Sequence, residues 1–139
     1  MTREEFIKQV GAGAAIALLT TCGVSCQKNN SNSAPVPQGP SNIDFTVSTA
    51  SGPLSANGGV IIQSGVIVAR TNAGAFIAVA VACTHEGSTI NYNAGSNSFI
   101  CPNHGAMFDA NGTVTNGPAT LPLKKYNTTI SGTTLHVFS

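Results

Sequence analysis

The chain has 139 residues, of which 42% are hydrophobic and only 8% are Asp, Glu, Lys or Arg. This length suits one domain of ordinary size, and the hydrophobic content is high enough for a packed core. The formal net charge of +1 gives no basic field for nucleic acid, so the composition argues against nucleic-acid binders, coiled coils and multi-pass membrane proteins.

The N-terminal segment has the features of an export signal. An uncharged apolar run, Val10–Thr20, follows Arg3 and Lys8 and is followed by small residues. The run is about half as long as the roughly 20 residues that a membrane-spanning helix needs. A positively charged start, a short apolar run and a small-residue end are typical of secretory signals. We therefore predict an export signal in residues 1–26, with a permanent membrane anchor as the alternative.

A cysteine closes this segment. Cys26 follows Val24-Ser25 and resembles a bacterial lipoprotein processing site, with Cys22 as the alternative. We favour lipidation of Cys26 over a cysteine in a discarded signal peptide. The predicted location is outside the bacterial cytoplasm, either in the periplasm or attached to the membrane by a lipid or anchor and facing the periplasm.

Residues 27–40 read QKNNSNSAPVPQGP, which is rich in Asn and Ser and then in Pro. This composition does not build a core, and it is typical of a flexible and then stiffened tether. Fully extended, the segment would reach at most ~50 Å.

Residues 41–139 are predicted to form one all-β domain. There is no helical apolar period, and short alternating runs are separated by turn signals such as Asn57-Gly58-Gly59 and Asn111-Gly112. Short strands at this spacing favour an antiparallel sandwich or small barrel. The alternating runs are Phe45/Val47, Val66/Val68, Phe76–Val81, Leu121/Leu123, Ile130 and Leu135/Val137.

Two short loops carry the residues suited to metal chemistry. One reads Cys83-Thr-His85-Glu-Gly and the other Cys101-Pro-Asn-His104-Gly, so each offers a thiolate and an imidazole beside a glycine. If one iron takes both cysteines and the other both histidines, the site is a Rieske [2Fe–2S] centre. The alternative is a structural Cys2His2 zinc site, although such sites usually pair the cysteines in one loop.

The chain resembles the Rieske iron–sulfur family at these loops and beyond them. The resemblance includes Gly105–Asp109, Gly112, Gly117-Pro118-Ala119 and Leu121, and it extends over about 80 residues. It implies a Rieske-type antiparallel β sandwich or barrel with a small cluster-binding subdomain at about residues 82–121. It also implies one [2Fe–2S] cluster per chain, covered by the Gly-Pro turn and bound by Cys83, His85, Cys101 and His104.

Four positions depart from the quinol-oxidising members of that family. Those members join the ligand loops by a disulfide, whereas the matching residues here are Ser88 and Asn103. They also place a serine and a tyrosine hydroxyl on the cluster, whereas the matching residues are Ala106 and Phe108. Hydrogen bonds to the sulfurs stabilise the reduced cluster, so their absence predicts a lower reduction potential.

The function predicted from the resemblance is one-electron transfer between redox donor and acceptor proteins, without a self-contained enzyme activity. The alternative is the electron-transfer subunit of a larger oxidoreductase, either a quinol-oxidising cytochrome complex or a molybdenum oxidase. A Rieske oxygenase is excluded by length and because only His136 remains for a second, mononuclear iron site.

Overall fold

The computed structural model describes residues 37–139, which form part of one compact unit, Pro35–Ser139. The predicted export signal in residues 1–26, Cys22 and Cys26 lie outside the described residues, as does most of the predicted tether. No helix in the described part is both long and apolar enough to cross a membrane.

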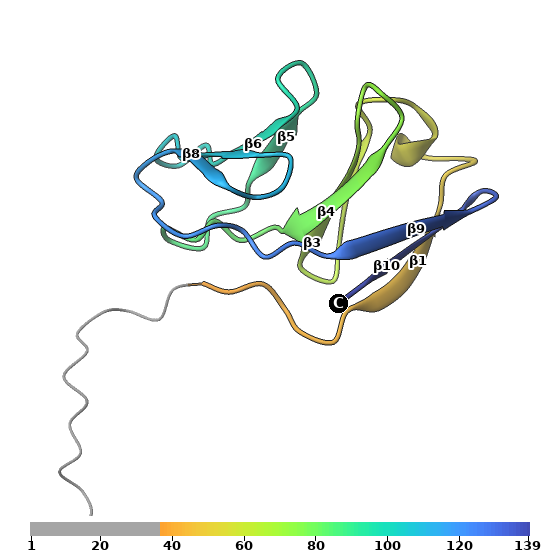
Figure 1. Cartoon of the computed structure of the whole chain (residues 1–139), viewed down its shortest axis with the longest axis horizontal. Coiled ribbons are helices and arrows are strands. Elements are labelled where there is room, and N and C mark those ends of the chain that lie inside the picture. Colours follow the sequence, from red (N-terminus) through yellow and green to blue (C-terminus); the bar gives the residue numbers. More distant parts are fainter. Residues whose placement is uncertain (1–36) are drawn as a thin grey trace, which may run out of the picture. The chain divides into compact units, whose positions relative to one another are not determined.

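The described residues form an all-β fold with antiparallel strand pairs, as predicted (Figure 1). One sheet has the strand order β1–β10–β9, another β2–β3–β4, and the third β5–β6–β7–β8. A short 3-10 helix, Pro53–Ser55, precedes β2. The strands are β1 Asp44–Ser48, β2 Val60–Gln63, β3 Val66–Arg70, β4 Phe76–Ala80, β5 Asn91–Asn93, β6 Ser98–Ile100, β7 Met107–Asp109, β8 Val114–Asn116, β9 Asn127–Ser131 and β10 Thr134–Phe138.

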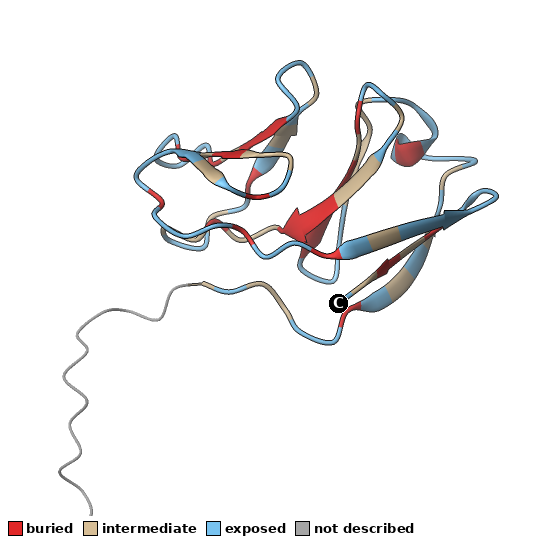
Figure 2. Ribbon diagram, in the orientation of Figure 1, coloured by how far each residue is buried: buried red, intermediate tan, exposed pale blue. Residues whose placement is uncertain are grey.

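The sheet β2–β3–β4 separates two buried cores. Side chains alternate along a strand, so neighbours on β3 face opposite sides of the sheet. Val66 and Val68 pack in one core with Ala78 of β4, whereas Ile67 packs in the other core with Val79. All of these side chains are at most 1% exposed, and Figure 2 shows the burial in the second half of β4. Full burial of each larger aliphatic side chain contributes about 1.5–3 kcal/mol to folding.

The segment that returns from β8 to β9 differs from the sequence prediction. The Leu121/Leu123 alternation suggested a strand, but residues 117–124 are irregular. Pro118 and Pro122 have no backbone N–H groups to donate to a strand ladder, which explains the difference. Leu123 is nevertheless buried, while Leu121 is 44% exposed.

The end of this segment is hydrogen-bonded to β4. The Ala80 N–H donates to the Lys124 carbonyl (2.8 Å), and the Tyr126 N–H donates to the Ala78 carbonyl (2.9 Å). The chain therefore runs antiparallel beside β4 before it enters β9. The loop from β4 to β5 and the loop from β6 to β7 carry the predicted ligands, and these hydrogen bonds hold the end of β4, from which the first of the two loops starts.

Candidate metal centre

The first ligand loop is a tight turn that begins directly after β4. The Cys83 N–H donates to the Ser88 carbonyl, and the Gly87 N–H donates back to the Cys83 carbonyl, each at 2.8 Å. Gly87 has φ +79°, in the left-handed region that glycine enters without steric cost. The two hydrogen bonds close the loop on itself, with the side chain of Cys83 at its start.

The second ligand loop, after β6, repeats this construction. The Cys101 N–H donates to the Ala106 carbonyl (2.8 Å), and the Gly105 N–H donates to the Cys101 carbonyl (2.9 Å). Gly105 has φ +76°. In both loops a cysteine is followed four residues later by a glycine in the left-handed region. The backbone similarity is greater than the sequences suggest, because the histidine lies two residues after Cys83 but three after Cys101.

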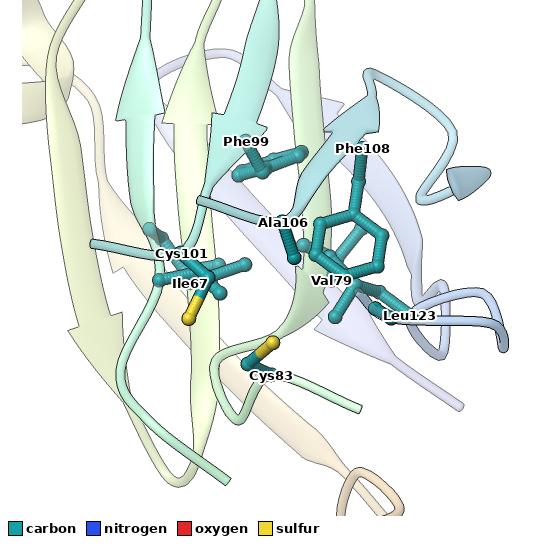
Figure 3. Close-up of a cluster of buried hydrophobic side chains, with 10 residues drawn as sticks. Ile67, Val79, Cys83, Phe99, Cys101, Ala106, Phe108 and Leu123 are labelled. Atoms are coloured by element: carbon teal, nitrogen blue, oxygen red, sulfur yellow. The ribbon is translucent and has the colours of Figure 1, made fainter. Parts of the chain in front are cut away.

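The two cysteines end side by side beneath the loops. Cys83 is 0% and Cys101 1% exposed, and both are free thiols. Figure 3 shows their side chains in one buried cluster with Phe99, Ala106 and Phe108. This cluster, the ligand core, consists of Ile67, Val79, Cys83, Ile90, Phe99, Cys101, Ala106, Phe108, Ala119 and Leu123.

Burial raises the pKa of the Cys83 thiol, because desolvation disfavours the thiolate. The backbone N–H groups of His85 and Glu86 act in the opposite direction, since they hydrogen-bond the sulfur. The neighbouring Cys101 thiol raises the pKa further. The loop therefore already directs amide donors at the sulfur, and a metal ion would displace the thiol proton on binding.

The two histidines meet each other, one from each loop. The ring centroids of His85 and His104 are 4.8 Å apart, and the rings are nearly perpendicular at 88°. Nδ1 of His85 is buried and has no hydrogen-bond partner. The His104 side chain is 41% exposed, and its Nδ1 lies 3.6 Å from Oε2 of Glu86.

A polar contact joins the two ligand loops near the surface. Nδ2 of Asn103 donates to the Ser88 hydroxyl at 3.0 Å and lies 3.5 Å from Oε2 of Glu86. These are the two positions that the family resemblance associates with a disulfide. The sequence showed that the cysteines were missing, but nothing local indicated that the replacements would pair.

Two further side chains fasten the loops to the rest of the domain, and neither was predicted from the sequence. The Thr84 hydroxyl donates to the Leu121 carbonyl at 2.7 Å and so links the first loop to the segment after the Gly-Pro turn. The Asn116 amide donates to the Gly105 carbonyl at 3.1 Å and links the second loop to β8. Both contacts join positions distant in sequence, so no short motif could reveal them.

The arrangement fits a group that takes both sulfur and nitrogen ligands. Two buried thiols lie close together, and the buried Nδ1 of His85 lacks the partner that a polar atom in a protein interior normally has. The structure thus brings the two cysteines together, and it brings the two histidines together, with one residue of each pair on each loop. Glu86 is a further donor: its carboxylate and the ring nitrogens of His85 and His104 all lie within 4.8 Å of one another.

Comparison with known proteins gives matches over the same region. A sequence profile of the Rieske [2Fe-2S] domain matches residues 49–127. The cytochrome b6-f complex iron-sulfur subunit of Chlorobaculum thiosulfatiphilum is 38% identical over 66 residues, which are 48% of this chain and 36% of that protein. The same subunit of Prochlorococcus marinus (strain MIT 9211) is 54% identical over 41 residues, 30% of this chain and 23% of that protein. The matches therefore span about a quarter to a third of these relatives.

A solved structure matches a larger share of the chain. The ferredoxin of carbazole 1,9a-dioxygenase from Nocardioides aromaticivorans IC177 aligns with a TM-score of 0.57 over 71% of this chain and 98% of that chain. Its sequence identity is 22%, so the likeness shows the fold alone.

Proposed function

The chain belongs to the Rieske [2Fe–2S] domain family, since the matched residues 49–127 are more than half of it, and we propose that it carries electrons through the cluster that this family binds. In this proposal Cys83 and Cys101 bind one iron, and His85 and His104 bind the other. The observation that carries it is a pair of neighbouring buried thiols, one from each loop, together with a buried His85 nitrogen that has no hydrogen-bond partner.

When bound, a [2Fe–2S] cluster accepts and returns one electron at a time. The protein residues have separate tasks around it. The ligand core would exclude water from the cysteine side of the cluster. Gly87 and Gly105 would allow the loop backbone to come close to the cluster. His104, at 41% exposed, places the histidine side at the protein surface, where electron exchange with another protein has the shortest path.

We further propose that this is an exported carrier, tethered to the membrane by a lipid on Cys26, that exchanges electrons with separate donor and acceptor proteins. The short apolar N-terminal run and the cysteine after it support export and lipidation. The polar residues at Ser88 and Asn103, and the absence of a hydroxyl at Ala106 and Phe108, support a carrier of lower potential rather than a quinol oxidant.

The alternative is a subunit of a larger oxidoreductase, and the similarity to cytochrome b6-f iron-sulfur subunits favours it. Isolation of the chain from its own membranes in a mild detergent separates the two proposals. Co-fractionation with haem-containing or molybdenum-containing subunits would support the complex and contradict the independent carrier. A chain that elutes alone, still loaded with iron, would support the carrier.

The cluster itself is tested by metal and sulfide analysis of the purified full chain. We expect about two irons and two acid-labile sulfides per chain. One zinc and no sulfide would establish the structural zinc alternative and overturn the proposed function. Pulsed electron paramagnetic resonance of the reduced protein should detect nitrogen coupling from both bound imidazoles.

The three histidines of the chain provide a matched control for the ligand assignment. His104→Ala should lose the cluster or its histidine nitrogen signal. His136→Ala should retain both, because His136 lies on β10 and pairs with Asp44 at 2.7 Å, away from the ligand loops. Loss of the cluster in His136→Ala alone would contradict the assignment.

A further inference from the structure

The chain just before β1 is fastened to the domain. The Pro40 carbonyl accepts two hydrogen bonds, one from the Tyr126 hydroxyl at 2.7 Å and one from Nζ of Lys124 at 3.0 Å. Tyr126 is only 3% exposed, so one of these donors is itself fixed in the core. We call residues Pro37–Pro40 the strap; the sequence had assigned them to the tether.

The strap fits its place so closely that a side chain is not accommodated at Gly39. A Cβ atom at this position would lie 2.5 Å from the Tyr126 hydroxyl oxygen and closer still to Cβ of Ala80. Glycine is the residue that allows such a close backbone approach. A pocket of about 270 Å³ beside it has walls from Pro37, Gln38 and Gly39 of the strap together with residues of the first ligand loop and of the segment before β9.

The strap also lies next to the first ligand loop. A Cβ atom built on Gly87 of that loop would lie 3.4 Å from Cγ of Pro37, and Thr84 of the same loop lines one pocket together with Pro37. In Figure 1 the strap is the first part of the orange segment. It ends four residues before β1, which begins at Asp44. Pro37, the first described residue, therefore lies beside the first ligand loop.

We infer that the docked strap keeps the metal centre within a fixed reach of the membrane surface. This inference rests on the proposed lipidation of Cys26. With the strap docked, only residues 27–36 separate the lipid from the domain, and they reach at most ~35 Å when extended. Because Pro37 lies against the first ligand loop, that length limits the height of the histidines above the bilayer.

Nuclear magnetic resonance of the oxidised, iron-loaded full chain tests whether the strap is docked. We expect the Gln38 and Gly39 signals to show the heteronuclear relaxation of the folded domain. A synthetic peptide of residues 33–42 supplies the reference for a free strap. Wild-type signals that match the peptide would overturn the inference.

Variants with a matched control show which contacts hold the strap. Lys124→Met and Tyr126→Phe each remove one donor to Pro40 and should move the Gln38 signals toward the peptide values. Gly39→Ala should displace the strap more completely than either of these substitutions, because its methyl group would overlap Ala80 and Tyr126. Lys125→Met is the control, because Nζ of Lys125 binds Oδ1 of Asn111 at 2.7 Å rather than Pro40. Equal effects of the two lysine variants would contradict the proposed contacts; visible absorption confirms that each variant is folded and loaded.

The membrane part is tested with the lipidated full chain on nanodiscs that contain a spin-labelled lipid headgroup. We expect the headgroup label to enhance the relaxation of the reduced cluster. The relaxation enhancement should fall when ten Gly/Ser residues are inserted after Val36. It should also fall in Gly39→Ala, but by a smaller amount. No enhancement in wild type on the disc would overturn the inference. A chain that does not attach to the disc would contradict the proposed tethering and leave the relaxation evidence for the strap intact.

Discussion

The amide group of Asn103 in the second ligand loop donates a hydrogen bond of 3.0 Å to the Ser88 hydroxyl in the first. The two loops that carry the candidate ligands are therefore joined by a polar contact where the quinol-oxidising relatives, by resemblance, have a covalent one. The contact is exposed, so water competes for both partners. It should hold the loops together more weakly than a disulfide does.

Asn103→Ala should accelerate loss of the cluster. A hydrogen bond contributes about 0.5–1.5 kcal/mol, which corresponds to cluster bleaching about twofold to tenfold faster. The rate is followed by visible absorption at fixed temperature, with Asn127→Ala on exposed β9 as the control. Ser88→Ala should add little to Asn103→Ala, because both substitutions remove the same contact. An unchanged bleaching rate in Asn103→Ala would show that this contact does not hold the loops.

Ala106→Ser should raise the reduction potential. Ala106 is completely buried in the ligand core with both cysteines, so a hydroxyl there is well placed to bond to sulfur. One added hydrogen bond to the reduced cluster is worth about 0.5–1.5 kcal/mol, or about 20–65 mV for one electron. A redox titration measures the midpoint, with Ala78→Ser in the other core as the control. The explanation fails if the midpoint of Ala106→Ser equals that of wild type.

Glu86→Gln should retain both irons and shift the potential upward. The Glu86 carboxylate is 56% exposed and belongs to the same donor group as His85 and His104, but the proposed assignment does not use it as a ligand. Removal of a solvated negative charge should favour the reduced cluster by about 0–1 kcal/mol, or up to about 40 mV. The shift should shrink in 1 M salt. Loss of iron in Glu86→Gln would instead make Glu86 a ligand.

The two tyrosines of the chain should lose their protons above pH 10 in the folded protein, and the protein should become less stable at alkaline pH. Burial raises the pKa of both Tyr92 and Tyr126 above the ordinary value of 10.0, because desolvation disfavours the phenolate. Above pH 10 the unfolded chain loses these protons before the folded one does. The stabilisation is therefore complete below pH 10 and is lost as pH rises through the folded-state pKa values.

Absorbance at 295 nm, which reports phenolate formation, measures these pKa values in the folded protein and in guanidinium. Tyr126→Phe should leave a single late transition, from Tyr92. A midpoint at or below pH 10 for either tyrosine in the folded protein would contradict the burial argument.

Much of the fold class was visible in the sequence because alternation of apolar residues is a local property. The runs at Phe45/Val47, Val66/Val68 and Leu135/Val137 correspond to β1, β3 and β10. The strands β5 to β8 have three residues each, which is too short for a periodic signal. The prediction at Leu121/Leu123 was wrong because alternation says nothing about the missing N–H groups of the neighbouring prolines.

The sequence by itself determined the candidate ligands: two cysteines and two histidines, divided between two loops that each contain a glycine. Ligand type and spacing are local, so they could be read without a fold. Only the tertiary structure decided which residues hold the loops, by pairing Asn103 with Ser88 and Thr84 with Leu121, and where the tether leaves, by placing Pro40 against Tyr126. These contacts join positions 15 to 86 residues apart, and their energies depend on distances in space that no sequence spacing specifies.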